Sequence, residues 1–235
     1  MNKSIPFWLL AAALACSTGC MTIHKAANKG DLVAVKAFLL KGTDVDARDA
    51  YGRTPLMYMV SDPESVRYLL AQGADANARD DLGETPLMKA GWVGQLATVR
   101  VLVEKGADVN ARNNAGETPL MRAVRNLDVV KYLVEQGADV NAKDNQGESV
   151  LLKASVSGRV RTVQYLKQKG AAVEAAPVKY IRRLDDPKTQ LGAQRRPAHH
   201  RILRALSSGG WPSQHFRRAP LSGYGKIRKN QIAGR

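Results

Sequence analysis

Cysteine is almost absent from this chain of 235 residues: Cys16 and Cys20 are the only two, and both lie close to the start. The sequence after residue 20 therefore lacks the thiols that a disulfide requires. Histidine is also scarce, and no histidine or cysteine after residue 20 has a second ligand at the spacing typical of a zinc site. The four histidines are His24, His199, His200 and His215. We predict no metal site and no cofactor.

Patterns that carry catalysis are missing as well. The glycines before residue 176 occur singly and follow the repeat period, so none forms the glycine-rich loop that binds phosphate groups. Ser149 and Ser155 have only His24 as a possible base before the final segment of the chain, and it lies far upstream. We therefore predict no catalytic residue, no enzymatic activity and no small-molecule substrate.

The start of the chain carries a hydrophobic run that is too short to cross a membrane. Ile5–Ala15 has 11 uncharged residues, whereas a membrane-spanning helix needs roughly 20. Lys3 precedes this run and small residues follow it. The pattern is typical of a secretory signal peptide, which we place at residues 1–19.

The segment Leu14–Cys20 resembles the lipobox of bacterial lipoproteins, in which a small residue precedes a cysteine that becomes lipidated. Neither Cys16 nor Cys20 has the leucine that usually lies three positions upstream. We predict lipidation of Cys20, because cleavage there leaves no free thiol in the mature chain; Cys16 is the alternative. An ordinary secretory signal without a lipid is a further alternative.

Four segments of the chain repeat one another, at intervals of 31, 33 and 31 residues. The motif TPLM, or SVLL in the last segment, begins at Thr54, Thr85, Thr118 and Ser149. The triplet GAD begins at Gly73, Gly106 and Gly137, with GTD before it at Gly42 and GAA after it at Gly170. Because several offsets recur together, the chain contains an internal structural repeat.

The segment that begins at Thr85 predicts a pair of helices. Threonine caps free amides and Pro86 fits the first helical position, so a helix should begin there. Apolar residues at helical spacing predict two short helices with a turn at Gly91 and Gly94 between them. Gly106 lies where the second helix needs a left-handed residue to end. One such pair cannot bury its apolar face alone, so neighbouring pairs must stack.

These offsets resemble the ankyrin repeat. The resemblance implies an all-α repeat solenoid, in which helix pairs stack and β-hairpin-like loops project from one side. We place this domain at residues 20–175, with about five repeats including caps. The first pair begins at Met21; no helix pair precedes it to cover it, so it should form the N-terminal cap. The last pair has a polar second helix and should form the C-terminal cap.

Two departures from the family pattern have structural consequences. The repeats that begin at Thr54 and Thr118 lack two residues between their helices, so we expect their first helices to lose part of the last turn. The family usually has a histidine after T-P-L, where its ring links neighbouring loops. Only His24 keeps it, and apolar side chains replace the others: Met57, Met88, Met121 and Leu152.

The segment 176–235 has a different composition. It contains 14 lysines and arginines but only two acidic residues, a net charge of +12 out of the +15 of the whole chain. Five prolines and few apolar residues predict a mostly disordered tail. The tail is either a binder of anionic polymers or membrane surfaces, or an extension with no role, including a frame-shifted end.

In the ankyrin family, partners commonly bind the concave side formed by the loop tips and the first helix of each pair. The aspartates at one repeated loop position, such as Asp75, should instead cap the loops. The resemblance implies that partner contacts come from the following positions. They are Tyr51, Arg53, Tyr58, Leu82, Glu84, Lys89, Trp92, Asn114, Glu117, Arg122, Arg125, Gln146, Glu148 and Lys153.

Among these positions, aromatic and arginine side chains are the usual anchors of an interface. Trp92 is notable because the repeat does not need a large aromatic residue before the turn; packing against the shortened neighbours is the alternative. The repeated glutamates, with Lys89, Arg122 and Lys153, are also consistent with surface ion pairs of under about 1 kcal/mol each.

The sequence as a whole favours a non-enzymatic ankyrin-repeat lipoprotein. We expect it to be monomeric, lipid-anchored in a bacterial cell envelope on the periplasmic side, and bound to another protein through its concave face. Nucleic acid is not the expected partner. The alternative is a scaffold whose basic tail binds an anionic polymer or membrane surface.

Overall fold

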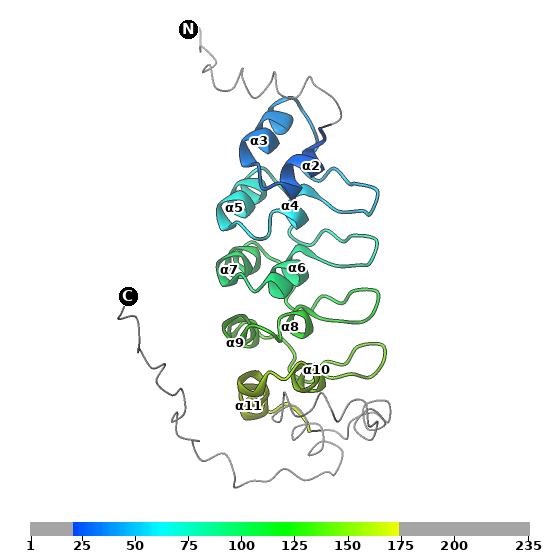
Figure 1. Ribbon diagram of the computed structural model, residues 1–235, viewed down its shortest axis with the longest axis vertical. Helices are drawn as coiled ribbons and strands as arrows, with labels where there is room; N and C mark the ends of the chain where they lie inside the picture. Colours follow the sequence, from blue (N-terminus) through cyan, green and yellow to red (C-terminus); the bar gives the residue numbers. More distant parts are fainter. Residues whose placement is uncertain (1–20, 174–235) are drawn as a thin grey trace, which may run out of the picture.

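The computed structural model describes residues 21–173 (Figure 1). Within this range the chain forms ten α-helices in five pairs, and no strand. The inner helices, the first of each pair, are α2 (Ile23–Asn28), α4 (Pro55–Tyr58), α6 (Pro86–Val93), α8 (Pro119–Arg122) and α10 (Val150–Val156). The outer helices are α3 (Leu32–Leu40), α5 (Pro63–Ala71), α7 (Leu96–Glu104), α9 (Leu127–Glu135) and α11 (Val160–Gln168).

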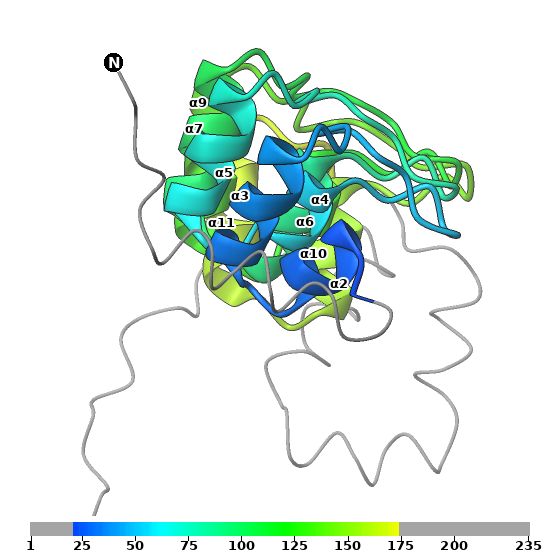
Figure 2. The same ribbon diagram turned by 90° about the horizontal axis from the view of Figure 1, so that it is seen from above.

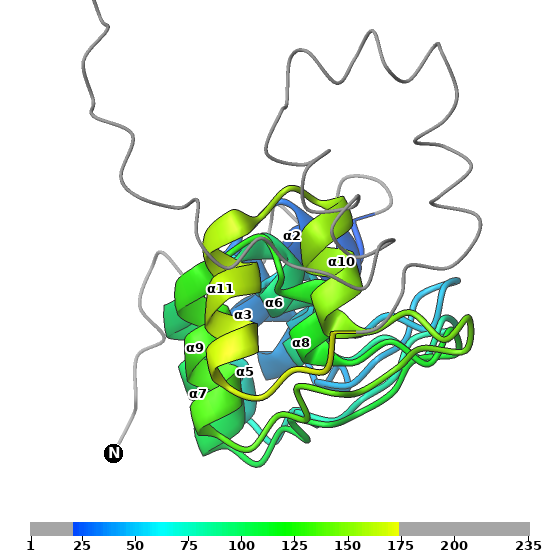
Figure 3. The same ribbon diagram turned by 90° about the horizontal axis from the view of Figure 1, so that it is seen from below.

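The five pairs stack into one column in chain order. Inner helices lie one above another, with the outer helices beside them (Figure 1). Seen along the column from either end, the loops between pairs project together to one side, away from the outer helices (Figures 2 and 3). This arrangement confirms the predicted all-α repeat solenoid. The projecting loops are hairpin-like in path, and the one bridge that the described residues contain pairs Lys143 with Ser149.

Two rows of leucines fill the interior of the column. The inner row comes from the repeated TPL motif, and the outer row comes from the second helices. All eight side chains are at most 2% exposed: Leu56, Leu87, Leu120, Leu151, Leu69, Leu102, Leu133 and Leu166. Burial of one such side chain contributes about 1.5–3 kcal/mol. The stack is therefore stabilised by contacts between neighbouring pairs, as expected for repeats that cannot fold singly.

The predicted helix starts are confirmed, although one of them lacks the cap hydrogen bond. Thr85 and Thr118 accept hydrogen bonds from the backbone amides of Met88 and Met121, at 3.3 and 3.4 Å. Ser149 does the same at the start of α10. Thr54 makes no such bond, although its side chain is buried.

The lengths of the inner helices follow the repeat intervals. α4 and α8 have four residues each, whereas α6 has eight. The expected loss of the last turn in the two shorter repeats is therefore confirmed. The prediction for Gly91 was wrong: it lies inside α6 and only Gly94, with a φ of 83°, forms the turn. A side chain at Gly91 would crowd α8, since a Cβ there would lie 3.3 Å from the Pro119 carbonyl oxygen.

Neighbouring loops are held together by polar side chains, most of which were not predicted from the sequence. His24 Nε2 lies 2.8 Å from the carbonyl oxygen of Ala47, as the family pattern implies. In later repeats the residues that replace this histidine are buried and apolar. Asparagines make the links there: Asn77 donates to Gly106 O at 2.9 Å and accepts from the Asp108 amide at 2.8 Å.

The asparagine link recurs along the column. Asn110 bridges to the next loop in the same way, and Asn141 to the one after it. The repeated aspartates cap their own loops, as predicted; Asp108, for example, accepts from the Asn110 amide at 2.9 Å. Losing the histidine therefore does not leave the loops unconnected.

Several predictions concern residues outside the described range. These are the signal peptide at residues 1–19, the lipidation of Cys20 or Cys16, and the basic tail at 176–235. The predicted boundaries of the repeat domain, at residues 20 and 175, also lie outside it.

Candidate partner-binding face

The loop tips present an exposed row of side chains that come from equivalent positions of successive repeats. Tyr51 and Leu82 are 63% and 61% exposed, and Ala115 and Gln146 are exposed at the equivalent positions further along, as is Asn114 beside Ala115. The tips are in register, because the carbonyl oxygens of Tyr51 and Leu82 each accept a backbone amide of the next loop at 3.0 Å. The row is apolar at its start and polar at its end.

Charged side chains join the loop bases to the inner helices. We call the following set the charged ladder: Asp80, Glu84, Lys89, Glu117, Arg122, Asp144, Glu148 and Lys153. Lys89 on α6 lies 2.8 Å from Asp80 and 2.9 Å from Glu84 within its own repeat. These contacts fix the loop to the helix that follows it.

The charged ladder also crosses from repeat to repeat. Arg122 on α8 lies 2.6 Å from Glu84 of the preceding repeat and 3.3 Å from Glu117 of its own. Lys153 on α10 lies 2.9 Å from Glu117 and 2.8 Å from Asp144. Neighbouring repeats are thus linked by ion pairs as well as by the leucine core.

The acidic members of the charged ladder are more buried than surface ion pairs would be. Glu84 and Glu148 are only 9% and 7% exposed. Both were predicted at partner contacts, or in surface ion pairs; instead, they are buried beneath the face. Burial of an ion pair removes water from both partners, so breaking one is more costly than at the surface.

The ionisation of the charged ladder follows from these contacts. Burial favours the neutral form of Glu117 and Asp144, but hydrogen bonds, first among them those from Lys153, and nearby positive charge together outweigh it and lower the pKa of both carboxyl groups. Burial also opposes the charge of Lys153, and the same bonds to Asp144 and Glu117 raise its pKa. The three groups are therefore held in their charged forms.

A second polar cluster lies at the first complete loop. The Tyr58 hydroxyl donates to Asp49 Oδ2 at 2.5 Å. Burial raises the pKa of Tyr58, and this bond raises it further. The Arg53 guanidinium lies 5.1 Å from the Tyr51 ring centroid and 5.9 Å from that of Tyr58. Arg53 and Tyr58 are half-buried, so Tyr51, at 63% exposed, is the most accessible part of this cluster.

Trp92 projects from the last turn of α6 and is 50% exposed. Two guanidinium groups of the next repeat lie against its ring, that of Arg122 at 5.0 Å from the ring centroid and that of Arg125 at 4.6 Å. The ring therefore packs against the shortened repeat, which was one of the two roles predicted for Trp92. Half of its surface is still open to a partner, as the other role, that of an interface anchor, requires.

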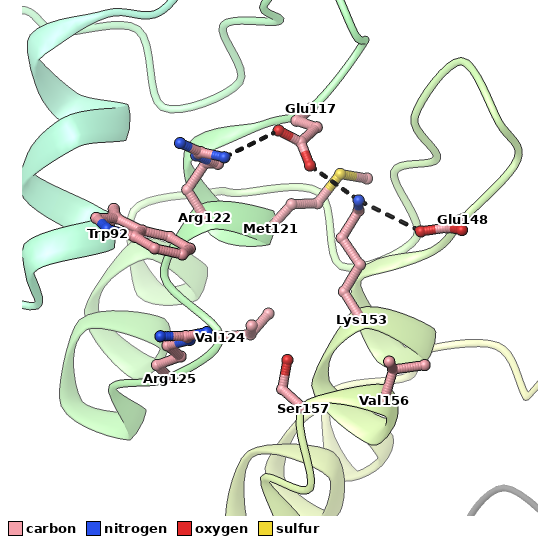
Figure 4. Close-up of a pocket in the computed structure, with 10 residues that line it drawn as sticks. All are labelled: Trp92, Glu117, Met121, Arg122, Val124, Arg125, Glu148, Lys153, Val156 and Ser157. Carbon is pink, nitrogen blue, oxygen red and sulfur yellow. Dashed lines mark hydrogen bonds and ion pairs between the residues drawn. The ribbon is translucent and has the colours of Figure 1, made fainter. Parts of the chain in front are cut away.

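A pocket of about 200 Å³ lies between α8, α10 and the end of α6. Its polar lining comes from Glu117, Arg122, Arg125, Glu148, Lys153 and Ser157, and its apolar lining from Trp92, Met121, Val124 and Val156. Figure 4 shows Trp92 and Arg125 at one side of this pocket and Lys153, Val156 and Ser157 at the other. We call it the Trp92 pocket.

The structure separates the predicted contact residues into groups by exposure. The exposed ones are Tyr51, Leu82, Trp92, Asn114, Arg125 and Gln146. The half-buried ones are Arg53, Tyr58, Lys89, Glu117, Arg122 and Lys153. The Asn114 side chain donates to the Asp81 carbonyl oxygen, so it also links two loops.

Asp80 and Asp144, two members of the charged ladder, were not predicted from the sequence. Each accepts two backbone amides of its own loop through one oxygen and lies 2.8 Å from a lysine through the other. Both are aspartates four residues before the repeated glutamate, so their spacing to Glu84 and Glu148 could have suggested the pair.

Residues 21–173 contain neither a candidate membrane-spanning helix nor a candidate metal site. None of the helices there combines the length and the apolar character needed to span a bilayer. No group of three or more histidine, cysteine, aspartate or glutamate side chains in this range could hold a metal ion.

Comparison with known proteins agrees with the fold. The family model described as ankyrin repeats (3 copies) matches residues 23–113 and again residues 106–176. No curated protein matches the chain, and no catalytic family is found. Ankyrin repeats typically bind other proteins and are generally non-enzymatic scaffolds. Since the matches span most of the chain, it belongs to the ankyrin-repeat family.

Proposed function

We propose that the protein is a non-enzymatic scaffold, lipid-anchored in a bacterial cell envelope on the periplasmic side, that binds a partner protein through the inner helices and loop tips. The observation that carries the binding role is the exposure of Tyr51 and Leu82 on the loop tips and of Trp92 in the last turn of the inner helix α6. None of the three is needed to fill the core. Exposed aromatic and apolar side chains beside arginines are the usual anchors of an interface.

The rigidity of the face supports binding without rearrangement. The loops are tied by asparagine links, and the charged ladder fixes them to the inner helices. A preorganised surface loses little conformational entropy when a partner docks. The proposed mode is therefore rigid-body docking.

A membrane anchor is supported by the sequence at the start of the chain. Cys20 immediately precedes the first repeat, whose α2 begins at Ile23. The adjacent helix α3 exposes Val33 and Leu40, at 48% and 71%. Lipidation of Cys20 brings these apolar side chains close to a bilayer, and several acyl chains anchor a protein firmly.

Site-specific crosslinking tests the binding role. A photo-reactive amino acid is placed at position 82 or 92, and at position 100 or 131 on the outer helices as a matched exposed control. We expect a discrete protein adduct in bacterial cells from positions 82 and 92 only. Equal adducts from the outer helices, or none from the loop side, would contradict the proposed face.

Intact-mass measurement tests the anchor. Protein from a bacterial membrane fraction should begin at Cys20 and carry acyl groups, and Cys20→Ala should remove them while Cys16→Ala does not. Acylation that depends on Cys16 would move the anchor to the alternative cysteine. A soluble chain without acyl groups would remove the envelope role.

The basic tail favours a second candidate function, because 12 of the 15 net positive charges lie after residue 175. Such a segment binds anionic polymers or lipid headgroups through counterion release, which makes the affinity fall steeply with salt. Binding to anionic vesicles that is lost on truncation after Ala176, and also at high salt, would favour this function. Binding unaffected by the truncation would exclude it.

A further inference from the structure

The Trp92 pocket exists because an inner helix of four residues lies between two longer ones. α8 ends at Arg122, whereas α6 before it continues to Val93 and α10 after it to Val156. Trp92 and Val156 come from the last turns of those longer helices and border the space that α8 leaves. The pocket thus follows from the deletion of two residues in the repeat that begins at Thr118.

We propose that the Trp92 pocket binds an acidic side chain of the partner protein, with its carboxylate on Arg125 and its methylene groups on the apolar floor. This inference rests on the proposed function, since it names the chemistry of the partner at the same face. It predicts a glutamate, or an aspartate, with apolar neighbours in the partner.

The floor of the pocket suits the aliphatic part of a side chain. Met121 and Val124 are 3% and 5% exposed, and Val156 is half-buried beside them. The volume of about 200 Å³ is several times the roughly 30 Å³ that one water occupies in the liquid. One long side chain therefore fits, whereas a helix or strand does not.

The pocket is lined by three cationic side chains, Arg122, Arg125 and Lys153. They differ in whether a carboxylate of the protein already pairs with them. Lys153 lies within 3.5 Å of three carboxylates, those of Glu117, Asp144 and Glu148. Arg122 lies within 3.3 Å of two, those of Glu84 and Glu117. Both are therefore compensated inside the charged ladder.

Arg125 is the exception. It is exposed, and within residues 21–173 its one charged or aromatic contact is with the ring of Trp92. No acidic side chain of this range forms an ion pair with it. Its planar guanidinium can hold a carboxylate through two parallel hydrogen bonds.

A cationic or purely apolar occupant fits the pocket less well. Glu117 is already paired with Arg122 and Lys153, so it offers little attraction to a further cation. Arg125 would repel such a cation at the mouth. A purely apolar side chain would leave the guanidinium without a counter-ion while removing water from it, which is unfavourable. The Ser157 hydroxyl, also in the lining, can donate a hydrogen bond to a carboxylate.

Peptide selection with the full mature chain tests this inference. Random 12-residue peptides displayed on phage are selected on the wild-type protein, and synthetic copies of the enriched peptides are measured by titration calorimetry. We expect a shared glutamate or aspartate beside apolar residues. Arg125→Glu should weaken these peptides at least about tenfold, and replacing the peptide's acid by glutamine should weaken binding to the wild-type protein similarly.

The matched control is Arg100→Glu. Arg100 is also exposed, and its guanidinium lies 4.6 Å from the ring centroid of Tyr132, but on the outer helices. The Arg100→Glu variant should bind the peptides with unchanged affinity. A peptide whose acid is replaced by lysine should bind Arg125→Glu better than it binds the wild-type protein, which a mere loss of folding cannot produce.

The outcomes separate this inference from the proposed function. Peptides that depend on Trp92 or Leu82 but not on Arg125, or that carry no acid, overturn the acidic ligand and leave the binding face intact. If no selected peptide depends on Trp92, Leu82 or Arg125, the result counts against the acidic ligand and against the binding face. Both are supported if the acidic peptides depend on Arg125 and the lysine-substituted peptide prefers Arg125→Glu.

Discussion

Lys153 and Glu117 lie 36 positions apart in the chain, yet the Lys153 ammonium is 2.9 Å from a carboxylate oxygen of Glu117. The lysine comes from α10 and the glutamate from the loop of the preceding repeat. Lys153 also contacts Asp144 of its own repeat at 2.8 Å. One side chain thus joins two repeats at the same face that presents the Trp92 pocket, so the stability of the stack and the shape of the pocket depend on the same contact.

Replacing Lys153 by methionine should destabilise the fold. The methylene stem is kept, but three carboxylates, those of Glu117, Asp144 and Glu148, then lie together without their shared cation. The Lys153 side chain is 18% exposed, so the loss resembles the breaking of a buried pair, and we expect about 3 kcal/mol. Urea unfolding followed by circular dichroism measures the change.

Lys131→Met is the control for this variant. Lys131 is exposed on the outer helix α9 and forms no ion pair with another residue of the described range. Its replacement should change the free energy of unfolding by less than about 0.5 kcal/mol. Equal losses in the two variants would show that the charged ladder contributes no more than an ordinary surface charge.

Acid should weaken the same contacts. The folded-state pKa of Glu117 and of Asp144 lies below the ordinary values of 4.5 and 3.8, despite burial. A carboxyl group of this kind stabilises the fold above its unfolded pKa, and that stabilisation is lost as pH falls through its folded pKa. We therefore expect the free energy of unfolding to decrease between about pH 5 and pH 2.

Comparing the wild-type protein with Lys153→Met isolates the part of this acid-induced loss of stability that comes from Glu117 and Asp144. Asp49 and Asp62 also have lowered pKa values, and their contribution to the slope is common to both proteins. The variant should lose less stability over the acid range, because its Glu117 and Asp144 no longer gain from the lysine. The pKa of Lys153 is raised, so the stability that the charged lysine contributes persists as pH rises to the ordinary lysine pKa of 10.5 and beyond. Identical acid slopes would contradict the assignment.

The two threonines at equivalent helix starts should differ when replaced by valine. Thr85 Oγ1 accepts from the Met88 amide at 3.3 Å, whereas the buried Thr54 hydroxyl makes no cap bond. Loss of a cap costs about 1 kcal/mol, so Thr85→Val should destabilise by that amount. Thr54→Val removes a buried hydroxyl without a cap bond and should be neutral or stabilising. Thermal unfolding of both variants checks this, and equal losses would show that the hydroxyl of Thr54 is bonded in solution.

The fold could be predicted from the sequence because each repeat position has one local task. Thr85 with Pro86 starts a helix, Gly106 ends one, and the interval of 31 residues shortens α4 and α8. Such features depend on a residue and its near neighbours in the chain. Gly91 was misplaced because glycine also serves close approach between helices, and the sequence alone does not distinguish that role from a turn.

The site could be predicted only in part, because it is made by contacts between repeats. The exposed tips, Tyr51 and Leu82, follow from the repeat position and were correctly placed on the surface. The burial of Glu84 depends on Arg122 reaching back from the next repeat, and the Trp92 pocket depends on the relative lengths of three helices. Repeat periodicity gives the position of a residue within its own unit, not the reach of its neighbour's side chain.

Gly94 and Gly106 should differ when replaced by alanine, although both have left-handed backbones, with φ of 83° and 85°. Either substitution carries the backbone cost of roughly 1–2 kcal/mol. A Cβ at Gly106 meets no atom within 4 Å, whereas one at Gly94 would lie 2.9 Å from Asn126 Nδ2. That nitrogen donates to the Gly94 carbonyl oxygen at 2.9 Å, and the Asn126 side-chain oxygen caps α9.

Gly94→Ala should therefore cost about 1 kcal/mol more than Gly106→Ala, because it displaces a hydrogen-bonded side chain that links two repeats. Urea unfolding of both variants, alone and combined with Asn126→Ala, measures this difference. In the Asn126→Ala background the extra cost should vanish, since the displaced side chain is already gone. Strictly additive losses would mean that Asn126 moves aside freely, and that the link between the turn of α6 and the start of α9 contributes little to the stack.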